Sequence, residues 1–298
     1  MSLLPRWSAM VGTMALAVLL AGCANRPAFS SRDPELRRAL TFHASFDRGT
    51  DADYALGDGW LYHVPAMDQW QETRPGLPSG TAIRVVPEAG KFGGALQFLE
   101  RTNPVIFYKA EGNVPWSARN WGGTVSFWLR TDLGSLPEGF NDPVQITPRR
   151  WNDAAFFVEF EKRSNNIPFR LGAYADFNVW NPRNRRWEDI PPAERPLVTI
   201  PGPPFSADRW THVAFTWERF NTGQPDGVAT LYLDGAQVGR LSPRTQTFTW
   251  DSGTPRLLVG LGYLGWFDDL AVFNRALTQS EIQQVRRLPR GIRSILQP

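Results

Sequence analysis

The sequence predicts an all-β fold, an antiparallel sandwich of two sheets with one short helix near the C-terminus. Several segments alternate apolar and polar residues with a period of two, which gives a β-strand one buried face. The 298 residues also include 26 glycines and 25 prolines, which favour turns. One segment carries a clear helix signal. Many strands, abundant turns and one helix are typical of a β-sandwich. Because we find neither an internal repeat nor a linker within the chain, we expect one domain.

The strands can be placed by their alternation. Leu40, Phe42 and Ala44 alternate with polar residues and predict the first strand. Further strands are predicted at residues 95–100, 124–131, 156–161, 169–174, 212–218, 228–233 and 266–274. Trp128 and Trp217 within them are large enough to fill the space between two sheets ~10 Å apart.

Turn and helix signals lie between and after these strands. Asp234-Gly235 separates two alternating segments, which is a strong local signal for a β-hairpin. Residues 191–204 are rich in proline and, with residues 178–189 before them, predict an extended surface loop. Thr278 and Glu281 form a T-x-x-E capping box, in which each side chain binds a backbone N–H near the helix start. The helix is therefore predicted to begin after Thr278.

Residues 1–22 are predicted to be a signal peptide. Arg6 is their only charge, and the apolar run at residues 10–20 is too short to cross a bilayer of ~30 Å as a helix. The ending L-A-G-C (20–23) resembles a bacterial lipobox, which implies cleavage before Cys23 and lipid attachment to its thiol. Such an anchor, with two or more acyl chains, binds a membrane stably. Ala24 after the cysteine implies, by resemblance to Gram-negative lipoproteins, the outer membrane. The alternative is an ordinary secretory signal.

The rest of the chain is expected to form a tether at residues 23–38, one domain at residues 39–287 and a basic tail at residues 288–298. The tail is expected to be a solvated end, although its arginines could also contact anionic lipid or lipopolysaccharide. Without Arg6, 31 of the 32 Lys and Arg remain against 29 Asp and Glu. This balance predicts no nucleic-acid partner. Cys23 is the only cysteine, so no intrachain disulfide can form.

Five motifs, in this order, resemble the laminin G-like, concanavalin A-like lectin/glucanase jelly roll. They are G-K-F-G-G-A-L-Q-F (90–98), V-S-F-W-L-R-T (125–131), W-T-H-V-A-F-T-W (210–217), L-Y-L-D-G (231–235) and F-D-D-L-A-V-F-N-R-A-L-T-Q-S-E-I (267–282). The resemblance covers about residues 39–285 and implies two antiparallel sheets, one of them concave. The family includes carbohydrate-binding modules, adhesion domains and glycan-cleaving enzymes, so the fold alone does not define the function.

The resemblance also implies a structural calcium ion near the two chain ends. Relatives often use an acidic residue after the first strand and another in the last strand. Here Asp47 and Asp51 follow the first strand and Asp268 lies in the last, and these three are the expected ligands because Ca²⁺ prefers carboxylate and carbonyl oxygens. The alternative is that Asp51 is a turn residue and that Asp268 only caps backbone donors.

Carbohydrate binding needs aromatic faces for stacking and polar groups for hydroxyls. Trp180, Asn181 and Trp187 lie together in the predicted loop region and are the expected ligand-binding residues. The alternative is that they are structural, because most of the 13 tryptophans must lie in the core.

Two glutamates could support catalysis instead. Glu159 and Glu161 lie on one face of a predicted strand, about 6.5–7 Å apart, within reach of the paired carboxylates that cleave glycosides. Glucanases of this fold carry E-x-D-x-x-E, whereas Phe160 separates the glutamates here. The alternative is a solvent-facing strand edge.

One nucleotide-like motif is set aside. G-L-G-Y-L-G (260–265) matches G-x-G-x-x-G, but a strand follows it where a dinucleotide site needs a helix, so no nucleotide is expected.

The sequence thus favours an envelope-anchored lipoprotein whose non-catalytic, lectin-like domain binds carbohydrate or an extracellular partner. The alternatives are a polysaccharide-cleaving enzyme, a hydrolase or lyase of the same fold, and a structural envelope protein. The arrangement of Glu159, Glu161, Trp180 and Trp187 separates them, since ligand binding requires that they line one groove.

Overall fold

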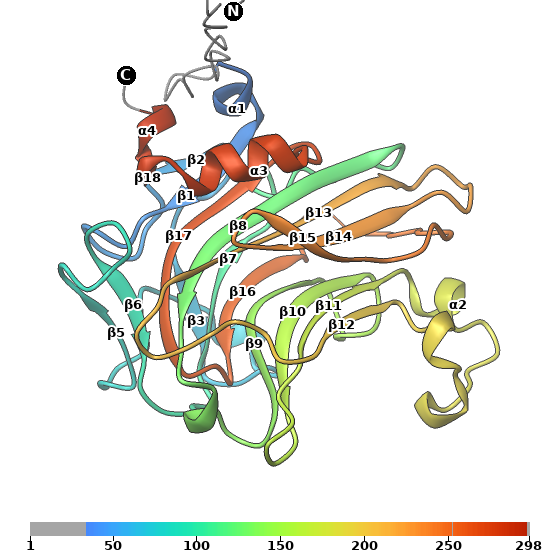
Figure 1. Ribbon diagram of the computed structural model, residues 1–298, viewed down its shortest axis with the longest axis horizontal. Helices are drawn as coiled ribbons and strands as arrows, with labels where there is room; N and C mark the ends of the chain where they lie inside the picture. The colour runs from blue at the N-terminus through green and yellow to red at the C-terminus, as the bar shows by residue number, and fades with distance from the viewer. Residues whose placement is uncertain (1–33, 252, 297–298) are drawn as a thin grey trace, which may run out of the picture. The chain divides into compact units, whose positions relative to one another are not determined.

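The computed structural model describes residues 34–251 and 253–296, and it contains two antiparallel sheets (Figure 1). The predicted signal peptide, Cys23 and most of the predicted tether lie outside the described residues. Each predicted strand is present, and the two-sheet β-sandwich is confirmed. Among the described helices, none is long and apolar enough to cross a membrane.

The first sheet contains the strands with the clearest alternation. In spatial order its strands are β15 (Ala236–Arg240), β14 (Val228–Leu233), β13 (Thr211–Phe220), β8 (Trp121–Arg130), β17 (Gly265–Phe273), β1 (Leu40–Ala44) and β2 (Tyr54–Ala55), while β6 (Ala95–Phe98) pairs with β17 and β5 (Ile83–Val86) with β6. Asp234 and Gly235 join β14 to β15 with positive φ at both positions, as the predicted hairpin turn requires.

The second sheet carries the surface on which the candidate site lies. Its strands, in spatial order, are β12 (Leu197–Ile200), β11 (Phe169–Tyr174), β10 (Ala155–Lys162), β9 (Gly139–Thr147), β16 (Arg256–Leu261), β7 (Val105–Lys109), β3 (Tyr62–Val64) and β4 (Arg74–Pro75). Strand β12 lies within the proline-rich stretch that predicted only a loop. As an edge strand it pairs on one side only, which is where nearby prolines are tolerated.

The described helices are short, and short 3₁₀ turns accompany them. The helices are α1 (Pro34–Ala39), α2 (Phe177–Trp180), α3 (Gln279–Arg286) and α4 (Arg293–Leu296), and the turns are η1 (Trp70–Glu72), η2 (Leu133–Ser135), η3 (Trp187–Asp189) and η4 (Pro192–Glu194). Helix α3 is the predicted helix. Its capping box is formed, because Thr278 Oγ1 accepts the Glu281 N–H at 3.3 Å and Glu281 Oε2 accepts the Thr278 N–H at 2.8 Å.

Large aromatic side chains fill the space between the two sheets. Trp121 is buried, and its ring contacts Phe156 from the second sheet and Trp217 from the first, with centroids 5.6 and 5.3 Å away. Trp217 therefore fills the space between the sheets as predicted, whereas the same prediction for Trp128 is wrong. The neighbours of Trp128 on β8 point into the core, so its own ring lies on the opposite face, where Phe92 covers it.

The C-terminal segment is packed, in contrast to the solvated tail that its arginines suggested. After α3, the chain forms β18 (Pro289–Ile292) and α4, and Leu288, Ile292 and Ile295 are buried with Leu36 of α1. This cluster covers the outer face of the first sheet beside α3 (Figure 1). Leu288, Ile292 and Ile295 are spaced four and three residues apart, which brings one side of the segment onto the sheet. Arg290 lies between them in the sequence and is exposed.

The capping box should make stability depend on pH. The Arg275 ion pair lowers the pKa of Glu281 to about 2, below about 4.3 in an unfolded chain. The contribution of ionised Glu281 to the free energy of unfolding is therefore complete above about pH 5 and is lost as the pH falls toward 2. We expect Glu281→Gln, which preserves the capping geometry, to lower the free energy of unfolding by roughly 0.5–1.5 kcal/mol at pH 7. Urea denaturation at pH 7, 5 and 3 should show this difference shrinking. A difference that does not change with pH would contradict the assignment, and exposed Glu218→Gln is the control.

Candidate functional site

A groove of about 900 Å³ lies on the outward face of the second sheet, over β9, β10, β11 and β16. The alternation of β10 builds it. Phe156, Val158 and Phe160 point into the core, and the residues between them, including Phe157 and Glu159, point into the groove. One strand thus supplies both the core and the floor of the groove.

Ion pairs run across the floor of the groove. Arg170 of β11 lies directly opposite Glu159 of β10 in the antiparallel register. Its two terminal nitrogens donate to separate carboxylates, Nη2 to Glu159 and Nη1 to Glu161. Arg163 donates a further hydrogen bond from Nε to Glu161 at 2.7 Å. The guanidinium of Arg170 therefore supplies positive charge to both carboxyl groups, although Glu159 is only 5% exposed.

A third carboxyl group, Asp142 of β9, lies beside Glu159. Burial raises the pKa of Asp142 well above its usual range, and the neighbouring charge of Glu159 raises it further. Burial also raises the pKa of Glu159, but Arg170 opposes this effect. Two adjacent carboxylates repel one another, so ionisation of one raises the pKa of the other. Asp142, whose pKa is raised further than that of Glu159, therefore holds a proton more readily, and that proton can be donated to the Glu159 carboxylate.

Aromatic rings form one end of the groove. Trp151 is 49% exposed, and its ring lies edge-on to Tyr174, with centroids 5.4 Å apart. Phe157 stacks on Tyr174 at 5.5 Å, and Trp187 lies 6.5 Å from Tyr174. Gly172 makes this possible, since a Cβ there would lie 2.3 Å from the Phe157 ring. The result is an apolar wall with an exposed indole above it.

The opposite part of the groove is bounded by another exposed ring. Phe140 is 51% exposed, and the guanidinium of Arg170 lies 5.4 Å from its centroid. The arginines Arg101, Arg149 and Arg150 are exposed at the rim. Polar groups at the floor thus lie between aromatic surfaces, which is the composition expected of a site for a polar ligand with apolar faces.

The structure brings together some of the predicted site residues. Glu159, Glu161 and Trp187 line the groove, whereas Trp180 and Asn181 do not. The Trp180 indole N–H donates to the Asn152 carbonyl at 2.8 Å. Asn181 is buried, and its side chain holds a turn by bonding the backbone of Arg185 at 2.9 and 3.0 Å. The Trp180 contact ties the loop to the turn between β9 and β10, and the Asn181 contacts lie within the loop.

Sequence reasoning missed four important groove residues: Trp151, Asp142, Arg170 and Tyr174. Arg170 and Tyr174 lie on a correctly predicted strand and alternate with its core residues, so their outward direction could have been inferred. No local pattern indicates Asp142, because β9 contains Asp-Pro and does not alternate cleanly.

The expected calcium ligands lie at two places. Asp47 Oδ1 accepts the Gly94 N–H at 2.6 Å and its carboxylate pairs with Arg293. Asp268 Oδ2 accepts the Phe92 N–H at 3.0 Å, while Asp268 Oδ1 is buried without a hydrogen bond. Asp51 caps a separate turn through the Leu61 N–H at 3.1 Å.

This arrangement offers limited support for a metal. Burial raises the pKa of Asp268 well above its usual range, and Arg293 already supplies positive charge to Asp47. Within residues 34–251 and 253–296, no group of three or more His, Cys, Asp or Glu side chains is placed to hold a metal ion. Among the three expected ligands, the buried Asp268 Oδ1, which accepts no hydrogen bond from the described residues, is the one oxygen that favours a bound cation. Calcium binding stays a prediction.

Comparison with known families agrees with this architecture. Residues 122–283 match the family model described as the concanavalin A-like lectin/glucanases superfamily, and the chain belongs to this superfamily. The comparison with curated proteins found no match.

Comparison with solved structures finds matches at low sequence identity, and among those described here only the two toxin domains, with TM-scores above 0.5, support the fold. Domain 4 of an extracellular arabinanase from Geobacillus stearothermophilus, in complex with arabinotriose, is 16% identical over 82% of this chain and 96% of that domain, with a TM-score of 0.49. The binding domain of Paraclostridial Mosquitocidal Protein 1 is 15% identical, and that of botulinum neurotoxin DC in complex with SialylT is 12% identical, each with a TM-score of 0.52. This chain spans about half of either toxin domain, since the alignments cover 84% of the chain and 52% of each domain. The likeness shows the fold alone.

The floor ion pairs should dominate the local stability. Arg170→Met leaves two carboxylates near one another without their cation, so we expect the free energy of unfolding to fall by about 3–5 kcal/mol. Adding Glu159→Gln and Glu161→Gln to this variant should recover part of the loss. Urea denaturation at pH 7 measures both, with exposed Arg84→Met as the control. A further loss in the triple variant would contradict the proposed charge balance.

Proposed function

We propose that the groove on the second sheet binds carbohydrate and that the domain acts as a lectin-like binding protein. The observation that carries this proposal is the juxtaposition of the exposed Trp151 face with the carboxylates of the groove floor. A sugar ring offers an apolar C–H face that can stack on an indole, and its hydroxyls can donate to carboxylate oxygens.

The identities of the floor groups favour hydroxyl donors as ligands. Arg170 uses its terminal nitrogens for Glu159 and Glu161, so the floor presents mainly acceptor oxygens. Membership of the lectin/glucanase superfamily supports a glycan ligand. Among the structural neighbours, the binding domain of botulinum neurotoxin DC was solved both with SialylT and with rat synaptotagmin II, which keeps a protein partner as the alternative ligand.

Binding should depend on Trp151. We expect purified full-length protein to bind at least one class of oligosaccharide on a glycan array. Trp151→Ala should then weaken the binding of that oligosaccharide by about 10–100-fold in calorimetry, because a stacking indole at a site centre is worth about 2 kcal/mol or more. Trp60→Ala, which removes an indole 58% exposed and outside the groove, should bind normally.

The same titration tests the calcium prediction. A repeat with a chelator should weaken binding only if a bound ion supports the groove. The lectin proposal fails if no glycan binds with or without added calcium.

Glycan cleavage is a second candidate function because Glu159 and Glu161 do line the groove. Asp142, whose pKa is raised further than that of Glu159, could act as an acid, with Glu159 as the adjacent base. Arg170 argues against this role, since it holds both glutamates in fixed ion pairs. Non-catalytic binding is therefore the function that the geometry favours.

Product analysis separates binding from cleavage. If the groove is catalytic, the bound oligosaccharide should be shortened, and Glu159→Gln should lower the rate by about 10²–10⁴-fold. Equal rates in wild type and Glu159→Gln would exclude this carboxyl pair. Exposed Glu218→Gln serves as the matched control.

We further propose that lipid on Cys23 anchors the domain to the bacterial outer membrane, on the strength of the L-A-G-C sequence. The full-length protein should enter the detergent phase of a Triton X-114 extraction, and Cys23→Ser should move it to the aqueous phase. Partition of this variant with the detergent would refute lipidation at this residue.

A further inference from the structure

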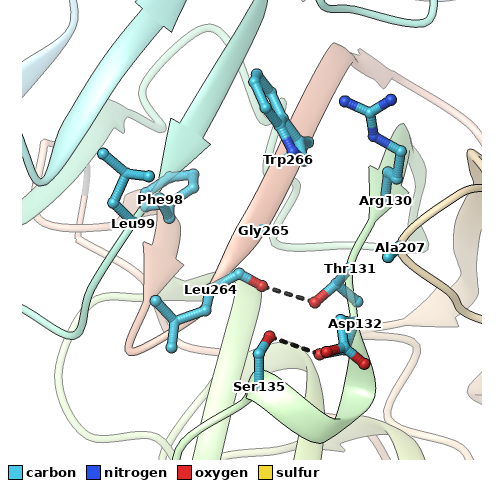
Figure 2. A pocket seen from close by; sticks show the side chains of 10 residues that line it. All are labelled: Phe98, Leu99, Arg130, Thr131, Asp132, Ser135, Ala207, Leu264, Gly265 and Trp266. Carbon is cyan, nitrogen blue, oxygen red and sulfur yellow. Dashed lines mark hydrogen bonds between the residues drawn. The ribbon is translucent and has the colours of Figure 1, made fainter.

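A second cavity, of about 270 Å³, lies where β8 ends and β17 begins (Figure 2). It shares no residue with the groove, although the two adjoin along the chain. Leu99 lines the cavity and Arg101 the groove, and Leu264 lines the cavity and Gly262 the groove. The proposed function makes no use of this cavity.

Arg130 gives the cavity its chemical character. Its guanidinium lies between two indole rings, 4.9 Å from the centroid of Trp266 and 5.1 Å from that of Trp210. Both rings lie within cation–π distance of the guanidinium and cover part of it from water. The guanidinium forms its hydrogen bonds through the N–H groups along its edge.

Those N–H groups have no acceptor in the described part of the chain. Nε is buried without a hydrogen-bond partner, and no ion pair or hydrogen bond involves the terminal nitrogens of Arg130 among the described residues. Most arginines near carboxylates in this protein are paired, including Arg170 and Arg293. A guanidinium without a partner that is already partly desolvated favours binding of an anion. Binding removes little further water from it, and the anion forms two charge-assisted hydrogen bonds with its N–H groups.

The opposite end of the cavity offers acceptors. Figure 2 shows Asp132 and Ser135 there, away from Arg130 and Trp266. One Asp132 oxygen accepts the Gly134 N–H at 3.0 Å, and the Ser135 hydroxyl donates to the Asp132 carbonyl at 2.8 Å. The second carboxylate oxygen of Asp132 and the lone pairs of Ser135 are therefore available to hydroxyl donors.

Apolar side chains lie along one side, between these two ends. Leu99 is 45% exposed and lies beside the buried Phe98 in Figure 2, and Leu264 also lines the cavity. The cavity thus combines a cationic donor, an apolar side and an anionic acceptor. A ligand that matches all three has a carboxylate, a compact ring and hydroxyl groups.

We propose that this cavity is a binding site for a sugar acid, such as a uronic acid residue, whose carboxylate pairs with the terminal nitrogens of Arg130. The ring lies against Leu99 and Leu264, and a hydroxyl donates to Asp132. The site is independent of the groove, so it stands even if the groove binds no glycan.

The test is a titration of the full-length protein with D-glucuronate, followed by the indole N–H signals in ¹⁵N–¹H spectra. Trp210→Phe and Trp266→Phe variants assign the two relevant signals. We expect glucuronate to shift these signals saturably. D-glucose, which lacks the carboxylate, should bind at least about tenfold more weakly than glucuronate. Acetate, which has the carboxylate without the ring, should also bind about tenfold or more weakly.

Variants locate the binding. Arg130→Met keeps the apolar stem and should weaken glucuronate binding about tenfold or more, whereas the same change at exposed Arg240 should not. Trp151→Ala, which disables the groove, should leave glucuronate binding unchanged. If Arg130→Met fails to fold, Arg130→Lys, which keeps the charge and loses the planar fork, gives the same comparison.

Four results would overturn the proposal. They are the absence of saturable shifts, equal binding of acetate and glucuronate, binding that survives Arg130→Met, and binding that is lost in Trp151→Ala. The last result would assign the sugar acid to the groove.

Discussion

Alternation along β10 is the constraint on which the rest of the structure depends. Successive side chains of a strand point to opposite faces, so the residues that let β10 seal the core dictate which residues reach the groove. Phe156 contacts Trp217 of the facing sheet at 4.8 Å, while its neighbour Phe157 supports the aromatic wall of the groove. A shift of one residue in register would exchange the two sets and would destroy both core and groove.

The same constraint explains why the floor charges must be balanced within the protein. Glu159 lies among core residues in sequence, and its side chain is almost fully covered. A carboxylate in such a place is tolerated only with a partner. The register places Arg170 directly across from it, and burial in the same surroundings raises the pKa of Asp142. The floor is consequently rich in oxygen acceptors and has little uncompensated charge.

Much of the fold could be predicted from the sequence, and much less of the site. Alternation identified strands such as β11 and β14, and chemistry specific to turns and caps identified Asp234-Gly235 and Thr278. Strand β9 was not predicted, because Asp142-Pro143 interrupts its alternation of apolar and polar residues. The Glu159–Arg170 pair depends on which strands are neighbours and in what register, and no single segment contains that information. Trp180 and Trp187 show the remaining difficulty: both flank the same loop, and only the packing of their rings distinguishes them.

The C-terminal segment that packs beside α1 has a consequence for the order of folding. Helix α1 contacts α4, Leu36 shares its cluster with Ile292 and Ile295, and β1 pairs with β17. The first strand of the domain thus pairs with a strand far along the chain, Leu40 with Phe273 and Ala44 with Leu270. Contacts of such long separation close late, since each must overcome the entropy of a very large loop. During synthesis, the domain cannot complete its first sheet until β17 has emerged, so the pairing of β1 with β17 is a closing step of its folding.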